Sequence, residues 1–440
     1  MKLTDIVLVL SVGSHESSAF FVDAKGQILG MGTQSFMCKK YMDKGVEIDP
    51  LELIYSLRSA VSQLYRKKHG RVVAIALYTV TQPSCVIWDK ETGLPLTPVV
   101  RSEGMSFSHI LKSFGKGYKH AFYGGIESWV VYHLTGRQVH LTDHTHASLT
   151  ECLDLNTGYW NASAVTNLDI DLADLPQPCE SGALFGQTKG FVPLADGIPI
   201  LAILTETHAK SIGFGCTHFG DSYFTYGALG QLYLNVGAQL KVFLKGKATL
   251  FQTYGESGTA SFRYGIDLAV PLPYEALKWV SPTLFDDPQS VQMQALSVLH
   301  SGGLKLKMKE KKVALIGLDA GVESSHMVRA FYEGVAYQVK DSITALEEVT
   351  GVFFKEICVD GPLSTHDYLM QMQADVLQIG VVRYHYPYMA VLGATLLAGI
   401  KCGVLQSKTD IAKCRKINKQ FLPSMDPISS LALYNEWRAS

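Results

Sequence analysis

The sequence predicts an α/β protein built from two domains. Its 440 residues are too many for one ordinary core and suit two domains of about 200 residues each. Strand-like apolar runs alternate with amphipathic helical segments along the chain, which is typical of α/β proteins. The apolar share of 47% and the charged share of 18% lie within the globular range, so disorder is not indicated.

The first half begins with a predicted hairpin. Residues 6–10 form an apolar run, 13–16 a polar turn and 19–22 the returning strand, and a third strand follows around Ile28. The other elements expected in this half are strands over 72–78, 86–88 and 198–204, and a helix over 125–134 that Gly136 ends.

The second half repeats this pattern after a boundary near residues 213–220. Its longest predicted helix covers 325–349, with Ser324 or Ser325 as the N-cap. The lysine-dense stretch 305–312 is predicted to be a solvated loop. The remaining expected elements are paired strands over 223–226 and 232–235, a helix near 290–299, a strand over 356–359, a helix whose Leu369, Met372, Val376 and Leu377 point inward, a strand over 381–384, and a small-residue helix over 390–399 lying close on a sheet.

Composition also excludes several classes of protein. A formal charge of -1 gives no general attraction to nucleic acid, and no apolar run approaches the ~20 residues of a membrane helix. The eight cysteines contain no C-x-x-C pair, which argues against a disulfide framework and a structural zinc site. We therefore expect a cytoplasmic protein that binds neither nucleic acid nor membrane.

Several long segments resemble one enzyme family. The stretches "FYEGVAYQVKDSITALEEVTGVFFKEICVDG", "LMQMQADVLQIGVVR" and "LGATLLAGIKCG" resemble the C-terminal signature of FGGY carbohydrate kinases, closest to glycerol kinases. The stretches "ESWVVYHLTG", "VHLTDHTHASLTECLDLNTGYW" and "VIWDKETGLPL" are similar to the N-terminal part of that family. The resemblance implies two actin-like (ribonuclease-H-like) domains facing across a cleft: 1–212, with the acceptor side and first phosphate loop, and 213–440, with the nucleotide side.

The same resemblance implies ATP and magnesium as cofactors and a small polyol or sugar as the substrate. It leaves open whether the chain forms a homo-oligomer. Phosphoryl transfer needs hydrogen-bond donors on the phosphates, a carboxylate-held metal ion and a base for the attacking hydroxyl.

The first phosphate loop of the family reads D-x-G-T-T-S, and the matching residues here are 11–17. The resemblance places nucleotide contacts at Gly13, Ser14 and His15. Ser11 stands where the family has its metal-side Asp and cannot supply that charge. Glu16 offers a carboxylate from a shifted position; the alternative is that this turn is kept for structure alone.

The general base of the family lies in a G-D-Q-Q-A-A-L-F-G segment, which matches residues 205–213. Glu206 is the matching acid, one methylene longer, and the resemblance makes it the catalytic base, an acceptor contact and a magnesium-side carboxylate. The alternative is a carboxylate that only complements a helix N-terminus. Gln82 and Thr207 are the other expected acceptor contacts, although the Arg-Glu pair of glycerol kinases is absent next to Gln82.

Two later loops correspond to the nucleotide side. Residues 225–230 match the family's T-Y-G-T-G, with Gly227 kept and Gly230 available one position later. Residues 360–364 match D-G-G-A-S, with Gly361 and Ser364 kept. Ser364 is alternatively the N-cap of the helix that follows.

Two functions are consistent with these motifs. One is an active kinase of this family with a changed acceptor. The other is a non-catalytic relative that keeps the two-domain shell as a binding, regulatory or scaffold protein, because the framework segments are well kept while the phosphate-side, base-side and acceptor-side residues have each changed.

Overall fold

The chain forms two compact units in the computed structural model. The model describes residues 4–41, 45–66, 70–102, 104–115, 117–227, 229–238, 248–254, 260–273, 288–309, 312–405 and 414–439. The first unit comprises Met1–Gly215, Ala238–Gly265 and Tyr388–Cys414, and the second comprises Cys216–Gly237, Ile266–Pro387 and Arg415–Ser440. The domain bounds 1–212 and 213–440 treat the chain as two uninterrupted halves and remain a prediction; the units divide it differently, since Tyr388–Cys414 packs in the first unit.

The first unit is centred on a five-stranded sheet of order β14-β6-β1-β2-β3. Strands β1, β6 and β14 are parallel neighbours, whereas β1, β2 and β3 form antiparallel pairs. The hairpin predicted at the N-terminus is confirmed. The strands are β1 (Asp5–Val12), β2 (Glu16–Asp23), β3 (Ile28–Ser35), β6 (Arg71–Thr79) and β14 (Ile200–Thr205).

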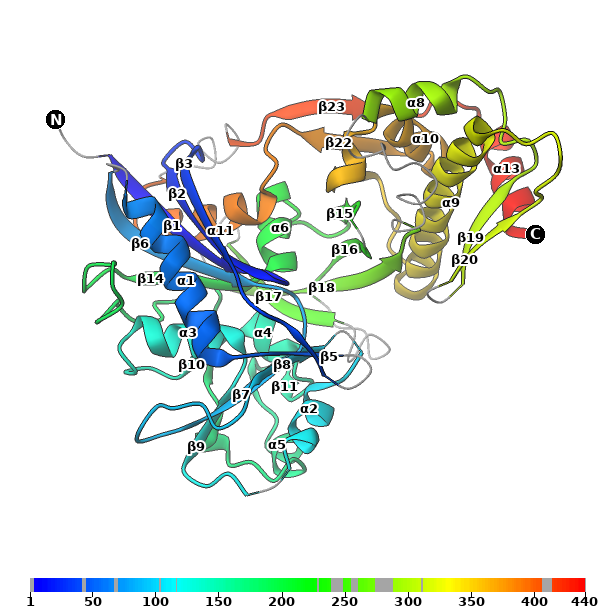
Figure 1. Ribbon diagram of the computed structural model, residues 1–440. Helices are drawn as coiled ribbons and strands as arrows, with labels where there is room; N and C mark the ends of the chain where they lie inside the picture. Colours follow the sequence, from blue (N-terminus) through cyan, green and yellow to red (C-terminus); the bar gives the residue numbers. More distant parts are fainter. Residues whose placement is uncertain are drawn as a thin grey trace. The chain divides into compact units, whose positions relative to one another are not determined.

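Helices cover both faces of this sheet (Figure 1). Alternate strand residues bury one face against α1 (Pro50–Tyr65) and α3 (Ile126–Leu134), and the other against α6 (Glu206–Phe214) and α11 (Met389–Lys401). Glycines let α6 and α11 cross closely: a Cβ on Gly393 would lie 1.8 Å from the carbonyl oxygen of Ala209. This crossing fixes α6, whose first residue is Glu206.

A second sheet in the first unit has the order β4-β5-β8-β7-β9 and shares a core with α2 and α5. Its elements are β4 (Lys39–Tyr41), β5 (Gly45–Ile48), β7 (Ser84–Asp89), β8 (Val99–Ser102), β9 (Ala121–Gly124), α2 (Phe107–Ser113) and α5 (Ala162–Thr166). The shorter elements are β10 (Leu141–Asp143), α4 (His144–Ser148), β11 (Leu153–Asp154), β12 (Tyr159–Trp160), η1 (Leu172–Asp174) and β13 (Gln177–Cys179), and β17 (Ala248–Tyr254) lies beside α4.

The sheet of the second unit repeats the strand arrangement of the first. Six consecutive strands of this sheet have the order β18-β16-β15-β21-β22-β23; β15 pairs antiparallel with β16 and parallel with β21, which pairs parallel with β22. The strands are β15 (Ser222–Thr225), β16 (Leu229–Gly237), β18 (Ala260–Pro271), β21 (Glu356–Asp360), β22 (Gly380–Tyr384) and β23 (Ile417–Phe421). The helices are α8 (Pro288–Leu296), α9 (Ser324–Thr350), η4 (Pro362–Thr365), α10 (Asp367–Leu377) and α13 (Pro427–Ala439).

Three local predictions in the second unit are wrong. The stretch predicted as a loop at 305–312 is a hairpin of β19 (Lys305–Lys309) and β20 (Lys312–Ile316), in which Leu306 is buried between partly exposed lysines; residues 310 and 311 lie outside the described part. The N-cap of α9 is Glu323 rather than either serine, because its side chain accepts from the third helical N–H. In α10, Met372 is only partly buried.

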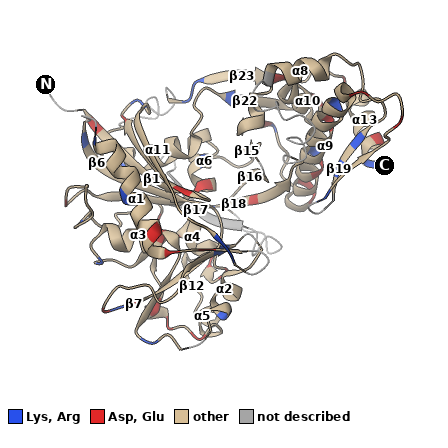
Figure 2. Ribbon diagram, in the orientation of Figure 1, with Lys and Arg blue, Asp and Glu red and all other residues tan. Residues whose placement is uncertain are grey.

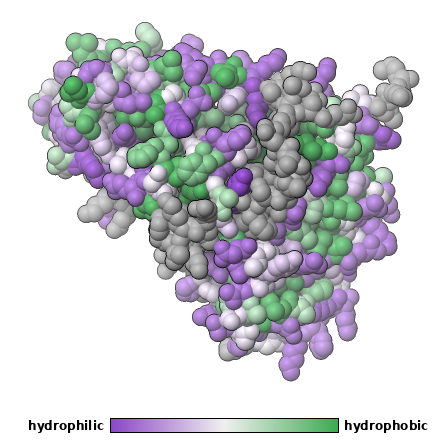
Figure 3. Space-filling view, turned by 180° about the vertical axis from the view of Figure 1, so that it is seen from behind, coloured by the Kyte–Doolittle hydropathy of each residue, from purple (hydrophilic) through white to green (hydrophobic). Residues whose placement is uncertain are grey.

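Charged residues of both signs are dispersed along the ribbons of each unit (Figure 2). On the face shown in Figure 3, apolar and polar residues are likewise interspersed over the coloured atoms. Among the described residues, no helix is both long and apolar enough to span a membrane.

Candidate active site

The carboxyl ends of the parallel strands β14, β6 and β1 meet at one edge of the first sheet. Ser11 pairs with Tyr78 across β1 and β6, and Leu204 pairs with Tyr78 across β14 and β6. The chain leaves these three strands into the β1–β2 turn, the segment after Thr79 and helix α6. Loops at the carboxyl ends of parallel strands are the usual place for ligand sites in α/β proteins.

Backbone hydrogen bonds fix the β1–β2 turn. The Gly13 N–H donates to the Glu16 carbonyl at 2.8 Å, and the Phe36 N–H donates to the His15 carbonyl at 3.0 Å. The buried guanidinium of Arg101 donates to the carbonyl of Ser14. The side chains of Ser14, His15 and Glu16 remain exposed, so the turn presents them to solvent on a fixed backbone.

Glu206 is the first residue of α6 and forms an ion pair with Lys210. Its Oε1 lies 3.1 Å from Lys210 Nζ, one helical turn later. The Lys210 side chain is 11% exposed and that of Glu206 is 34% exposed, so the lysine approaches the carboxylate from the protein side. Thr205 caps α6 by accepting from the His208 N–H.

Tyr78 lies beside this ion pair and links it to Ser11. Burial raises the pKa of the Tyr78 phenol, the negative charge of Glu206 raises it further, and a hydrogen bond with the Ser11 side chain opposes the rise. Tyr78 therefore remains a neutral hydroxyl. Neither Tyr78 nor Lys210 was predicted as a site residue, although the spacing of Glu206 and Lys210 by four residues on a helix was a usable signal.

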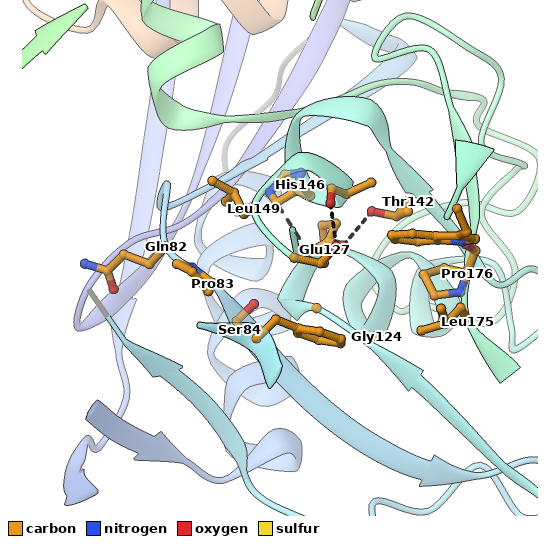
Figure 4. A pocket seen from close by; sticks show the side chains of 15 residues that line it. Gln82, Pro83, Ser84, Gly124, Glu127, Thr142, His146, Leu149, Leu175 and Pro176 are labelled. Carbon is orange, nitrogen blue, oxygen red and sulfur yellow. Dashed lines mark hydrogen bonds and ion pairs between the residues drawn. The ribbon is translucent and has the colours of Figure 1, made fainter. Parts of the chain in front are cut away.

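A pocket opens next to this edge, and Figure 4 shows the residues that line it. Thr81 connects the sheet edge to the pocket, since its hydroxyl accepts a hydrogen bond from the Thr207 N–H at 2.9 Å. The next three residues, Gln82, Pro83 and Ser84, form one side of the pocket. Thr207 is thus linked to the segment that carries Gln82, and Glu206 precedes Thr207 at the start of α6; the roles of the three as acceptor-side residues remain predictions. The other lining residues are mostly apolar or small, including Phe107, Gly124, Trp160, Leu175 and Pro176.

The polar wall of the pocket belongs to a buried hydrogen-bond network. Glu127 lies between Thr142 and His146 (Figure 4): it accepts from the Thr142 hydroxyl at 2.7 Å, and its Oε2 is 4.0 Å from His146 Nε2. The opposite ring nitrogen of His146 bonds to Asp143, and its Nε2 is also 2.8 Å from the Thr79 hydroxyl. Sequence reasoning missed this network because Thr79 and Glu127 are distant from 142–146 in the chain.

Neighbouring charges favour the ionised forms of His146 and Asp143. Burial disfavours the imidazolium of His146, but the carboxylates of Glu127 and Asp143 outweigh burial and raise the pKa of His146. Burial likewise disfavours ionised Asp143, yet His146, Ser181 and Thr145 together lower the pKa of Asp143 to about 2. The Thr145 hydroxyl also accepts from the Thr205 N–H at 3.0 Å, so the network positions the start of α6 and with it Glu206.

In the second unit, Gly227 and Gly361 lie at the carboxyl ends of the parallel strands β15 and β21. The Tyr226 N–H donates to the Asp360 carbonyl at 2.8 Å, which holds the two loops together. Gly361 has a φ of 90°, and a Cβ there would lie 2.5 Å from the Tyr226 carbonyl oxygen, so glycine is required. At Gly227, a Cβ would meet the Leu229 carbonyl oxygen at 3.4 Å, an ordinary contact.

Gly230 and Ser364 have clear structural roles. A Cβ on Gly230 would lie 2.7 Å from Phe224 Cζ, so Gly230 packs tightly against the Phe224 ring of the same unit. The Ser364 hydroxyl donates to the Gly361 carbonyl at 2.7 Å within η4. The alternative of Ser364 as N-cap of the next helix is wrong, because His366 occupies that position in α10. A nucleotide contact from either residue remains a prediction.

Known proteins resemble this chain over its full length. The C-terminal and N-terminal domain models of the FGGY family of carbohydrate kinases match residues 294–402 and 115–213. Glycerol kinase from Limosilactobacillus reuteri (strain DSM 20016) is 26% identical over 491 residues, covering 100% of this chain and 98% of that protein. The resemblance to the FGGY family of carbohydrate kinases that the sequence predicts is confirmed.

Solved structures show the same fold. The crystal structure of Plasmodium falciparum glycerol kinase with ADP has a TM-score of 0.87 at 19% identity and covers 100% of this chain and 98% of its own. Xylulose kinase from Rhodospirillum rubrum has a TM-score of 0.84 at 18% identity and covers 99% and 98%. The predicted fold class, two actin-like (ribonuclease-H-like) domains of α/β type, is confirmed.

Against the FGGY motifs, the edge of the first sheet has lost negative charge and gained positive charge. Ser11 replaces the aspartate of D-x-G-T-T-S, and Lys210 stands at the second alanine of G-D-Q-Q-A-A-L-F-G. Magnesium is bound through carboxylates and water. Here Glu206, the carboxylate at the start of α6, is paired with Lys210, and Glu16 is exposed on the turn. These residues do not fit a magnesium ion held by protein carboxylates, and the described residues contain no group of three His, Cys, Asp or Glu side chains arranged for a metal.

Proposed function

We propose that this chain transfers the terminal phosphoryl group of ATP to a hydroxyl of a polyol or sugar, with Glu206 as the general base. The observation that carries this proposal is the close grouping of the β1–β2 turn, Thr81 and Glu206 at one edge of the first sheet, next to the pocket lined by Gln82. Relatives named glycerol kinase and xylulose kinase support the class of acceptor.

The acceptor is proposed to bind in this pocket. Gln82 and Ser84 offer polar contacts, while Phe107, Trp160 and Leu175 present apolar surface to the carbon skeleton. Thr207 adjoins this segment through the hydrogen bond from its N–H to Thr81. The Arg-Glu pair expected of a glycerol kinase is absent from the segment Thr81-Gln82-Pro83-Ser84. Glycerol is therefore one member of the acceptor panel rather than the assigned substrate.

The reaction follows from the chemistry of the edge residues. The acceptor hydroxyl gives its proton to the Glu206 carboxylate as its oxygen forms a bond to the terminal phosphorus, and the bond from that phosphorus to ADP breaks. Gly13, Ser14 and His15 would contact the phosphates from the turn, where backbone N–H groups and a hydroxyl suit oxyanions. By the family resemblance, Gly227, Gly230, Gly361 and Ser364 are the other proposed nucleotide contacts.

The Glu206–Lys210 ion pair specifically favours a second candidate function. The Lys210 ammonium group lies 3.1 Å from Glu206 Oε1 and so engages the carboxylate that would have to accept the proton of the acceptor hydroxyl. Together with Ser11, this feature favours a chain that binds nucleotide without transferring phosphate, as a regulatory or scaffold protein.

Turnover assays over a panel of polyols and ketoses separate these functions. An active enzyme should release ADP only with particular acceptors, and Glu206→Gln should remove that turnover while leaving ATP-induced thermal stabilisation in place. Glu206→Asp restores the family's residue type and should retain activity. Stabilisation by ATP without turnover on any acceptor would support the binding protein, and full activity of Glu206→Gln would exclude the proposed base.

A further inference from the structure

The charges at the edge of the first sheet suggest how this site balances the negative charge of Glu206. Lys210 Nζ lies 3.1 Å from Glu206 Oε1, and the lysine side chain is 11% exposed. Lysine is rarely this buried unless its charge is compensated. We therefore regard the ion pair as a stable part of the folded α6. Side chains from the neighbouring strands, Ser11 on β1 and Tyr78 on β6, complete the group without adding a charge.

The formal charge of this group is therefore zero. Glu206 contributes -1, Lys210 contributes +1, and both hydroxyls are neutral. A divalent cation is bound by oxygen ligands with net negative charge. The Lys210 ammonium group takes up one acceptor position of the Glu206 carboxylate and also repels any other cation that approaches it. The edge has a carboxylate but lacks the charge for a metal site.

We propose that the Lys210 ammonium is the resident cation of this site, acting as a positioning residue for Glu206 in place of a divalent metal ion held by protein carboxylates. The inference rests on the proposed role of Glu206 but concerns metal binding, which is measurable without turnover. Magnesium that arrives bound to ATP is part of the substrate and is unaffected. Lys210 also fixes the Glu206 side chain toward α6, so a change there alters both the charge and the direction of the carboxylate.

The test measures binding of Mn²⁺ to the full chain without nucleotide, by electron paramagnetic resonance of free Mn²⁺. The parent protein should show no saturable site at millimolar Mn²⁺. Ser11→Asp/Lys210→Met should gain one site, tighter than that of either single variant by at least about tenfold, because ligand charge sets the affinity of such sites. Methionine keeps the buried length of the lysine stem and removes only its charge.

Two controls separate charge from packing. Lys210→Arg keeps the positive charge and should bind no Mn²⁺, like the parent. Lys90→Met removes a partly buried lysine whose Nζ lies 2.5 Å from Asp174 in the same unit, and it should gain no site. Circular dichroism and thermal melting check that each variant is folded. If the double variant does not fold, Lys210→Met alone carries the test and should bind Mn²⁺ measurably more tightly than the parent.

Either of two results would overturn the proposal. One is a saturable Mn²⁺ site in the parent that disappears in Glu206→Gln. The other is a folded double variant that gains no site. The proposed function fails separately, if no acceptor supports turnover, and that result leaves the Mn²⁺ measurement valid.

Discussion

The corresponding edges of the two sheets share a backbone arrangement and differ in their charges. In the first unit, a hairpin strand (β1) lies parallel to β6, and the edge carries Glu206 paired with Lys210. In the second unit, the hairpin strand β15 lies parallel to β21, and Asp360 accepts from the Thr225 hydroxyl at 2.6 Å. Strand pairing between apolar runs sets the layout in both, so edge residues can change charge without changing the fold.

The largest expected effect is a loss of turnover that differs between the acidic residues at the two edges. Under the proposed function, Glu206→Gln should lower kcat by about 10²–10⁴-fold, the usual loss on removing a positioned base. Asp360→Asn keeps an oxygen that accepts from Thr225, so its turnover should fall far less. Steady-state assays with a productive acceptor would measure both. Equal losses in the two variants would mean that the edges do not differ in chemistry.

A second pair of variants compares the glycines of the two turns. Gly361→Ala should destabilise the protein by at least about 1–3 kcal/mol, because its φ of 90° is unfavourable for alanine and its Cβ would collide with the Tyr226 carbonyl oxygen. Gly13→Ala should cost less than about 1 kcal/mol, since its Cβ would lie 3.2 Å from the Glu16 carbonyl oxygen without a positive φ. Urea unfolding measures both, and a larger loss at Gly13 would contradict this comparison.

The strands and helices were largely predictable, because they depend on local apolar periodicity. The strand expected at 6–10 is Asp5–Val12, and the helix expected at 325–349 is Ser324–Thr350. The stretch at 305–312 was mistaken for a loop because its lysines obscured the alternation that buries Leu306. That pattern was present in the sequence and was given too little weight.

The candidate site was predictable only where motifs matched. Glu206, Thr207 and Gln82 were identified by resemblance; the Thr207 N–H donates to Thr81, next to Gln82, and the roles of all three stay predictions. The buried network of Glu127, Asp143 and His146 could not be predicted, because its members come from different elements that only tertiary packing brings into contact. The packing of Tyr388–Cys414 in the first unit has the same cause.

A third comparison concerns two glycines of the second unit. Gly227→Val should abolish ATP-induced stabilisation, which for the parent is about 2.7 kcal/mol when ATP is present at 100 times its Kd. Its Cβ would make only an ordinary contact with Leu229, so the fold should persist. Gly230→Ala should instead lower stability without ATP, because its Cβ would lie 2.7 Å from Phe224. Thermal-shift assays with and without ATP measure both, and an unchanged shift in Gly227→Val would place the nucleotide elsewhere.

The smallest expected effect is a pH dependence that belongs to the first unit, through its buried network. The folded-state pKa of Asp143, about 2, lies below its ordinary value of 3.8. Asp143 therefore contributes about 2 kcal/mol of stability that is present above pH 4 and lost as the pH falls through 2. The pKa of His146 is raised above 6.5, so its contribution to stability is present below pH 6.5 and lost as the pH rises through the folded-state value.

Urea unfolding from pH 2 to 9 measures both contributions. The loss of stability at acidic pH should be smaller in Asp143→Asn than in the parent, and the loss at alkaline pH should be smaller in His146→Gln. Both variants should be less stable than the parent near pH 5, where both charges are present. An alkaline loss of equal size in the parent and in His146→Gln would mean that His146 is neutral in the folded protein.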